Sequence, residues 1–146
     1  PAPERAMIGI LLITHGQLGQ EILKCAESVV GKQAAVRVLG LDAAEGPDAF
    51  QKKIQVALGE MASPAGVLVL ADMMGGTPCN VALRQCRDPR FHYELVTGVS
   101  LPMLLSALSN RHYMPLEQLA QKLVEDAARN VARPIQKLRD SLKEDK

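Results

Sequence analysis

The apolar residues of this chain fall into short continuous runs that alternate with segments of helical periodicity. The runs are residues 7–13, 36–41, 66–71 and 92–97. The first and third are almost wholly apolar, as expected for central strands of a parallel sheet that helices cover on both faces. The second alternates more between apolar and polar residues and suits a position nearer an edge. The pattern therefore predicts four strands, two of them central.

Apolar residues recur at helical spacing between these runs and after the last one. The predicted helices are residues 18–30, 47–61, 78–86 and 101–108. For the third helix we predict Thr77 as the N-cap and Pro78 as the first helical residue, because a hydroxyl cap and an early proline both favour a helix start.

The last part of the chain, residues 115–146, carries one long amphipathic pattern that Pro134 interrupts. Proline disrupts a helix interior, so we expect a kink or a new helix there. The apolar face either packs on its own domain, leaving a solvated tip, or docks on a second subunit. The whole pattern predicts an α/β fold: a doubly wound, mainly parallel four-stranded sheet with helices on both faces and a C-terminal amphipathic helix.

The chain divides into three segments of different character. Residues 1–6 show no periodicity and precede Met7, so we expect a disordered extension or a remnant of cloning. Residues 7–132 are predicted to form one domain, which is long enough to bury a sizeable core. Residues 133–146 are predicted to form a charged helical tail.

The composition argues against several classes of protein. A net charge of +1, dispersed basic residues and 3% aromatic residues give no indication of binding to nucleic acid or anionic lipid. The three cysteines form no C-x-x-C pair and no acidic metal-binding cluster is evident, so we expect neither metal nor cofactor. The chain shows no signal sequence and no membrane-spanning run, which favours the reducing cytosol.

The candidate chemistry lies where two apolar runs end. His15 follows the first run within Thr14-His15-Gly16, and Asp72 follows the third. If the two strands are parallel neighbours, both side chains lie at the edge of the sheet where ligands bind in such folds. An unprotonated histidine nitrogen is nucleophilic near neutral pH. A carboxylate bonded to the other nitrogen would orient the ring and stabilise its developing positive charge.

A glycine-rich turn follows the third run and opens a helix. Glycines can bring backbone N–H groups close to an anion, and a helix N-terminus adds a positive dipole end. The residues predicted to bind phosphate are Thr14, Gly16, Gly75, Gly76 and Thr77. No Walker A or dinucleotide motif is present. The pattern therefore predicts phosphoryl transfer through His15, with the phosphate coming from another protein rather than from a nucleotide.

Three stretches of the chain resemble the mannose/fructose-type enzyme IIA of the bacterial phosphoenolpyruvate-dependent sugar phosphotransferase system. They are residues 7–16, V-L-V-L-A-D-M-M-G-G-T-P-C-N at 67–80, and E-L-V-T-G-V-S-L-P-M-L-L at 94–105. The resemblance extends from about residue 7 to 123, and the joint spacing of T-H-G, D-x-x-G-G-T-P-x-N and G-V-x-L-P-M is highly specific. Ser100 departs from the family, since many relatives have asparagine there.

The resemblance implies a function and partners. The family's phosphorylated histidine corresponds to His15, its orienting aspartate to Asp72, and its phosphate-holding turn to residues 75–77. The family implies a homodimeric, cofactor-free phosphotransferase subunit of the cytoplasm, in some cases peripheral to a membrane permease complex. It accepts phosphate from the carrier HPr, itself charged by enzyme I. It then passes the phosphate to a IIB component for sugar uptake, or serves to regulate another protein. Some relatives carry a fused IIB domain, which this sequence does not contain after its C-terminal helix. We therefore expect the IIB component to be a separate chain.

Other functions fit parts of the pattern. The phosphoryl donor subunit of a dihydroxyacetone kinase also uses a strand-end histidine. That branch typically has serine after the histidine and lacks G-G-T-P-x-N, so Gly16 and residues 75–80 argue against it. A flavodoxin-like module would bind a phosphate-bearing ligand without covalent chemistry, and a histidine–aspartate acid/base enzyme lacks an evident third group. Covalent modification of His15 separates these alternatives. The sugar and the modified ring nitrogen are open at this point.

Overall fold

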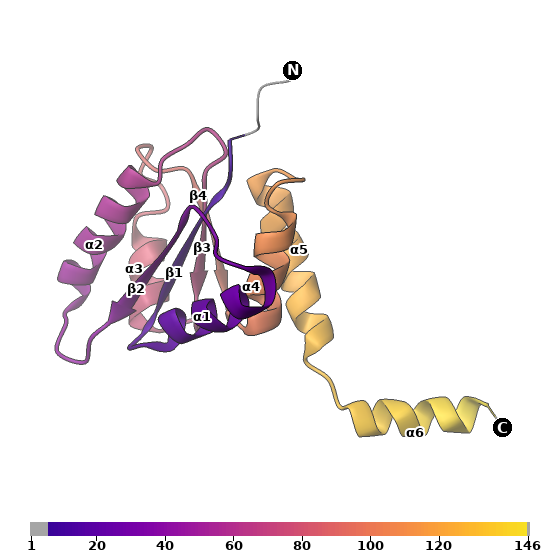
Figure 1. The fold of residues 1–146 in the computed structure, drawn as a ribbon. Helices are drawn as coiled ribbons and strands as arrows, with labels where there is room; N and C mark the ends of the chain where they lie inside the picture. The colour runs from indigo at the N-terminus through magenta and orange to yellow at the C-terminus, as the bar shows by residue number, and fades with distance from the viewer. Residues whose placement is uncertain (1–5, 146) are drawn as a thin grey trace, which may run out of the picture.

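The computed structural model describes residues 6–145, so most of the predicted N-terminal extension lies outside the described residues. Strands and helices alternate from β1 to α4, and two helices follow (Figure 1). In chain order the elements are β1 (Gly9–His15), α1 (Leu18–Val30), β2 (Val36–Leu41), α2 (Pro47–Glu60), β3 (Val67–Ala71), α3 (Thr77–Arg84), β4 (Tyr93–Thr97), α4 (Leu101–Asn110), α5 (Leu116–Asn130) and α6 (Pro134–Glu144). The predicted α/β class is confirmed.

The strands within residues 6–145 form one sheet in the order β2-β1-β3-β4, with every neighbouring pair parallel. β1 and β3 are the central strands, as their apolar runs predict, and β2 lies at an edge. Ile13 of β1 pairs with Ala71 of β3. His15 and Asp72 therefore lie at the carboxyl ends of adjacent strands, at the same end of the sheet.

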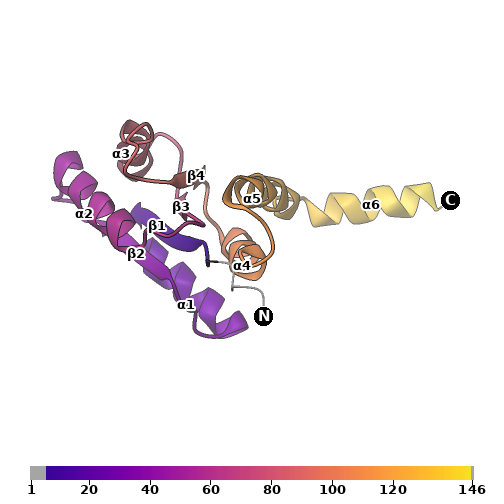
Figure 2. The same cartoon turned by 90° about the horizontal axis from the view of Figure 1, so that it is seen from above.

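The sheet separates two apolar cores. Ile10 and Leu12 of β1 face one core with α1, α4 and α5, whereas Leu11 and Ile13 face the other core with α2 and α3. Figure 2 shows the helices on the two sides of the sheet. Both faces of β1 are buried because side chains alternate between the faces of a strand. That burial explains why the run is apolar without interruption.

The start of α3 differs by one residue from the prediction. Gly76 has the extended backbone of an N-cap, Thr77 and Pro78 begin the helix, and no side chain caps it. Thr77 was predicted to cap the helix with its hydroxyl, but the hydroxyl does not do so. Ser100, by contrast, caps α4, because its hydroxyl oxygen accepts a hydrogen bond from the Met103 backbone N–H at 3.3 Å.

The predicted long C-terminal helix consists of two helices with different surroundings. Leu116, Leu119 and Leu123 of α5 are buried in the core, so α5 packs on its own domain. α5 ends at Asn130, and Pro134 is the first residue of the separate helix α6, a position that favours proline. α6, described in full, has no buried residue and projects away from the domain (Figure 1).

Arg111, the C-cap residue of α4, is buried and connects several elements. The sequence did not predict this role. It is 3% exposed, and its guanidinium donates to main-chain carbonyls at the starts of β1 and β2. The distances are 3.3 Å to Ile8, 2.7 Å to Ala34 and 3.4 Å to Ala35. Burial lowers the pKa of Arg111. Arg111 therefore holds together the amino ends of β1 and β2, at the end of the sheet opposite to His15.

Candidate functional site

His15 and Asp72 are joined by two hydrogen bonds to a single carboxylate oxygen. The backbone N–H of His15 donates to Asp72 Oδ2 at 3.0 Å, and ring atom Nδ1 lies 2.7 Å from the same oxygen. The side chain of His15 is 47% exposed and that of Asp72 is 9% exposed. The buried carboxylate therefore orients an accessible ring.

The electrostatics of the pair determine the tautomer of the ring. Burial alone would raise the pKa of Asp72, but the hydrogen bonds from the His15 backbone and ring, with the charge of the ring, outweigh it and hold that pKa below its usual value. An ionised carboxylate accepts hydrogen bonds and cannot donate one. Nδ1 must therefore carry the proton, which leaves the lone pair of the neutral ring on Nε2.

The glycine turn lies directly against this ring. A Cβ atom on Gly76 would be 2.8 Å from His15 Cε1 and 3.5 Å from Nε2. Gly75 has φ +84°, a left-handed conformation that favours glycine, and its carbonyl accepts a hydrogen bond from the Asn80 side chain at 3.1 Å. The missing side chain at Gly76 thus allows the backbone at the start of α3 to approach Nε2 of His15.

The predicted residues that flank His15 have other contacts. Thr14 is fully buried, and its hydroxyl oxygen accepts from the Gly19 backbone N–H at 2.9 Å, so any contact with phosphate would involve its backbone. The backbone N–H of Gly16 donates to the Leu41 carbonyl at 2.9 Å. The structure therefore brings Asp72 and Gly76 to the ring, whereas the side chain of Thr14 points into the protein.

Gly40 of β2 supports the loop after His15 and escaped sequence reasoning. A Cβ atom on Gly40 would lie 2.2 Å from the Gly16 carbonyl oxygen, so no larger residue fits without moving this loop. A glycine inside a strand often marks such a close approach of backbones. That signal was present in V-R-V-L-G-L, but the partner was not visible in the sequence.

Four short connections surround the site at the carboxyl end of the sheet, one after each strand. They are residues 16–17, 42–46, 72–76 and 98–100, and none of them contains lysine or arginine. The part of the chain that the structure describes contains no group of three or more His, Cys, Asp or Glu side chains that could hold a metal ion. The donors available at this end of the sheet are backbone N–H groups, the Thr77 hydroxyl and the N-terminus of α3.

Replacing Gly76 with alanine tests the close approach of the turn. The new methyl group would meet the His15 ring at 2.8 Å, so the ring must rotate or the turn must shift. Because the backbone of Gly76 is extended, alanine adopts it without strain, and we expect near-normal thermal stability. Modification of His15 should become slower by about tenfold or more, since small displacements of reacting groups are costly. Rates within a factor of about two of the parent would contradict this role.

The chain is similar to known proteins over most of its length. The family model described as "PTS system fructose IIA component" matches residues 9–124. The chain is 33% identical over 135 residues to the PTS system mannose-specific EIIAB component of Escherichia coli (strain K12), covering 89% of this chain and 42% of that protein. It is 28% identical over 117 residues to the PTS system fructose-specific EIIA component of Bacillus subtilis (strain 168), covering 80% of each.

Solved structures show the same fold. The PTS IIA protein associated with the fucose utilization operon from Streptococcus pneumoniae has a TM-score of 0.78 and 31% identity, covering 92% of this chain and 99% of that one. The mannose/sorbose specific IIA subunit from Enterococcus faecalis has a TM-score of 0.79 and 29% identity, covering 88% and 95%. The chain spans 42% of the length of the E. coli relative, which is a longer protein.

Proposed function

The chain belongs to the fructose IIA family of the sugar phosphotransferase system, and on that premise we propose that it is a phosphohistidine carrier whose nucleophile is His15. Nε2 attacks the phosphorus atom of a phosphorylated donor, the bond from that phosphorus to the donor breaks, and the phosphoryl group stays on Nε2. A nucleophile on the acceptor later takes the group in the same way. The observation that carries this proposal is the 2.7 Å contact between Nδ1 and Asp72 Oδ2, which leaves Nε2 accessible with its lone pair.

Asp72 supports both steps without taking up a proton. The ring gains positive character when Nε2 bonds to phosphorus, and the ionised carboxylate beside Nδ1 balances that charge. Gly75, Gly76 and Thr77 offer donors to the phosphoryl oxygens. We keep Thr14 and Gly16 in the proposal as backbone neighbours of the phosphoryl group.

The partners follow from the family. We propose HPr as the donor and a IIB component, or a regulated protein, as the acceptor, all in the cytoplasm and at times beside a membrane permease. Among residues 6–145, no helix has both the length and the apolar character needed to cross a membrane.

Intact-mass analysis tests the proposal. The protein is incubated with phosphoenolpyruvate, enzyme I and HPr, and an acid-labile gain of one phosphoryl group is expected. Absence of the gain while HPr is demonstrably charged would refute the carrier role and favour non-covalent binding of a phosphate-bearing ligand.

We also propose that the chain is a homodimer. Ile135, Leu138 and Leu142 lie at helical spacing on α6 and are between 57% and 67% exposed, so a second chain would bury them. Light scattering is expected to give the mass of two chains, and Leu138→Glu should give the mass of one. A monomeric parent protein would contradict the proposal.

A further inference from the structure

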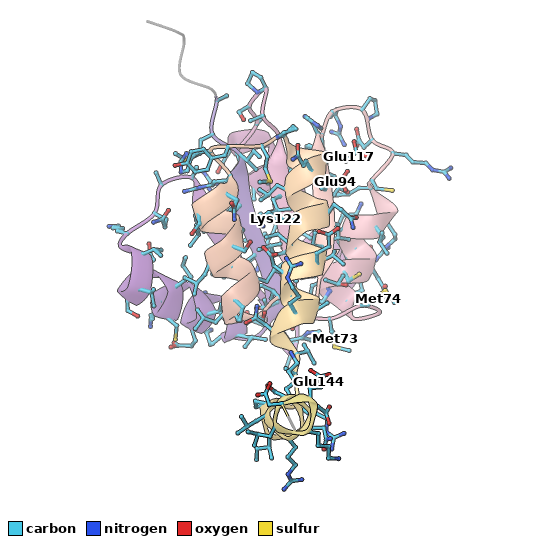
Figure 3. All side chains as sticks on the ribbon, turned by 90° about the vertical axis from the view of Figure 1, so that its right-hand side faces the viewer. Met73, Met74, Glu94, Glu117, Lys122 and Glu144 are labelled. Carbon is cyan, nitrogen blue, oxygen red and sulfur yellow. The ribbon has the colours of Figure 1, made fainter. Side chains whose placement is uncertain are left out.

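Two large apolar side chains are exposed beside the proposed nucleophile. Met73 and Met74 follow Asp72 directly and are 53% and 77% exposed. In Figure 3 both are labelled at the same end of the domain, outside the ribbon. Methionine is an apolar residue that usually lies in the core. Two neighbouring methionines in solvent at a reactive site are consistent with a surface that a partner covers.

Met73 lies so close to Nε2 that a protein donor cannot avoid it. The position that a Gly76 Cβ would occupy is 3.2 Å from Met73 Cγ and 3.5 Å from His15 Nε2, so both atoms flank one point. For the transfer step the donor must bring its phosphorus atom to within about 3.5 Å of Nε2. The donor surface around that phosphorus atom must then rest on the Met73 side chain.

Further apolar side chains are exposed around the methionines. Leu18 and Leu101, the first residues of α1 and α4, are 45% and 36% exposed, and both helices begin at this edge of the sheet. The four connections there contain no lysine or arginine. The connections contain three carboxylates: Glu45 is paired with Lys53 at 2.5 Å, Asp72 with His15 at 2.7 Å, and Asp42 is exposed. The exposed apolar side chains at this end of the sheet therefore favour a partner with an apolar surface.

We propose that Met73 and Met74 form the docking contact for the protein that donates the phosphoryl group. The inference rests on the proposed function. The partner that fits is a phosphorylated protein with apolar side chains around its phosphoryl group. The flexible thioether side chains adapt to the shape of such a surface.

A double variant tests the docking contact. Met73→Gln with Met74→Gln keeps the length of both side chains and makes them polar. Val56→Gln on α2 is the matched control, because Val56 is 59% exposed and lies away from the site. Each protein is phosphorylated once by charged HPr and once by phosphoramidate, a small donor that needs no docking surface. With HPr we expect kcat/KM of the double variant to fall by about tenfold and that of the control to stay unchanged.

The small donor separates docking from reactivity. We expect phosphoramidate to modify the parent, the double variant and the control at similar rates. An equal loss with both donors would mean that the methionines position His15, and unchanged kcat/KM with HPr would mean that they contribute nothing; either result overturns the proposal. Met74→Gln alone, which changes the more exposed side chain, is expected to lower only the HPr reaction. If phosphoramidate modifies the parent but HPr does not, HPr is the wrong donor; if neither does, the proposed function itself is wrong.

Discussion

A His15→Ala variant is expected to fold normally and to accept no phosphoryl group from charged HPr or from phosphoramidate. The ring is 47% exposed at the end of β1, so its removal leaves no cavity in either core. The free energy of unfolding should change by less than about 1 kcal/mol. Removal of the nucleophile should abolish the reaction, since no neighbouring group offers an equivalent lone pair. Thermal unfolding and intact mass measure the two effects.

The other histidines supply matched controls for this variant. His92 and His112 are both exposed and lie outside the site, in the approach to β4 and after α4. His92→Ala and His112→Ala should accept phosphate at the rate of the parent. Acid-labile phosphate on the His15→Ala protein, or its loss in either control, would assign the nucleophile to another residue.

Asp72→Asn is expected to slow transfer by about a hundredfold while the ring stays in place. The amide oxygen can take the place of Oδ2 and accept both hydrogen bonds from His15, but it cannot balance the charge on a phosphorylated ring. The amide nitrogen would occupy the place of Oδ1, which is buried without a partner in the described part of the chain. Asp42→Asn, an exposed change at the same edge, is the control, and equal rates for both variants would exclude the role of Asp72.

The same variant has a predictable dependence of stability on pH. Hydrogen bonds from His15 lower the pKa of Asp72 in the folded protein, so the carboxylate stabilises the fold above its unfolded pKa of about 3.9. That stabilisation is lost as the pH falls through the lowered pKa. The difference in the free energy of unfolding between parent and Asp72→Asn should therefore be largest near neutral pH and shrink in acid. Denaturant titrations at several pH values measure it.

Sequence reasoning succeeded where local pattern and topology decide the outcome. The runs at β1 and β3 are apolar throughout because both faces of each strand are buried, and this pattern predicted their central position. Right-handed crossovers then place the two strand ends at one edge. That argument brought His15 and Asp72 together, and the geometry agrees with it. The helix limits were predicted to within two residues for α1, α2, α3 and α4.

The missed features depend on contacts between residues far apart in the chain. The role of Arg111 was not predicted, because the carbonyl groups that its guanidinium contacts belong to residues at least 76 positions away. Gly40 has a role only because Gly16 approaches it from the loop after β1. The bond from Asn80 to Gly75 depends on the exact fold of a turn. The periodicity of residues 134–144 predicted a helix with an apolar face but could not tell what covers that face.

The shortness of the four connections around His15 has a consequence for water. None of the segments 16–17, 42–46, 72–76 and 98–100 is long enough to fold over the ring as a lid, and the ring is half exposed. The chain therefore does not exclude water from the ring by itself. In the proposed relay the donor or acceptor covers the exposed side of the site, and water is excluded only while two proteins are in contact. Between encounters the phosphohistidine faces solvent, and its lifetime is limited by hydrolysis rather than by the fold.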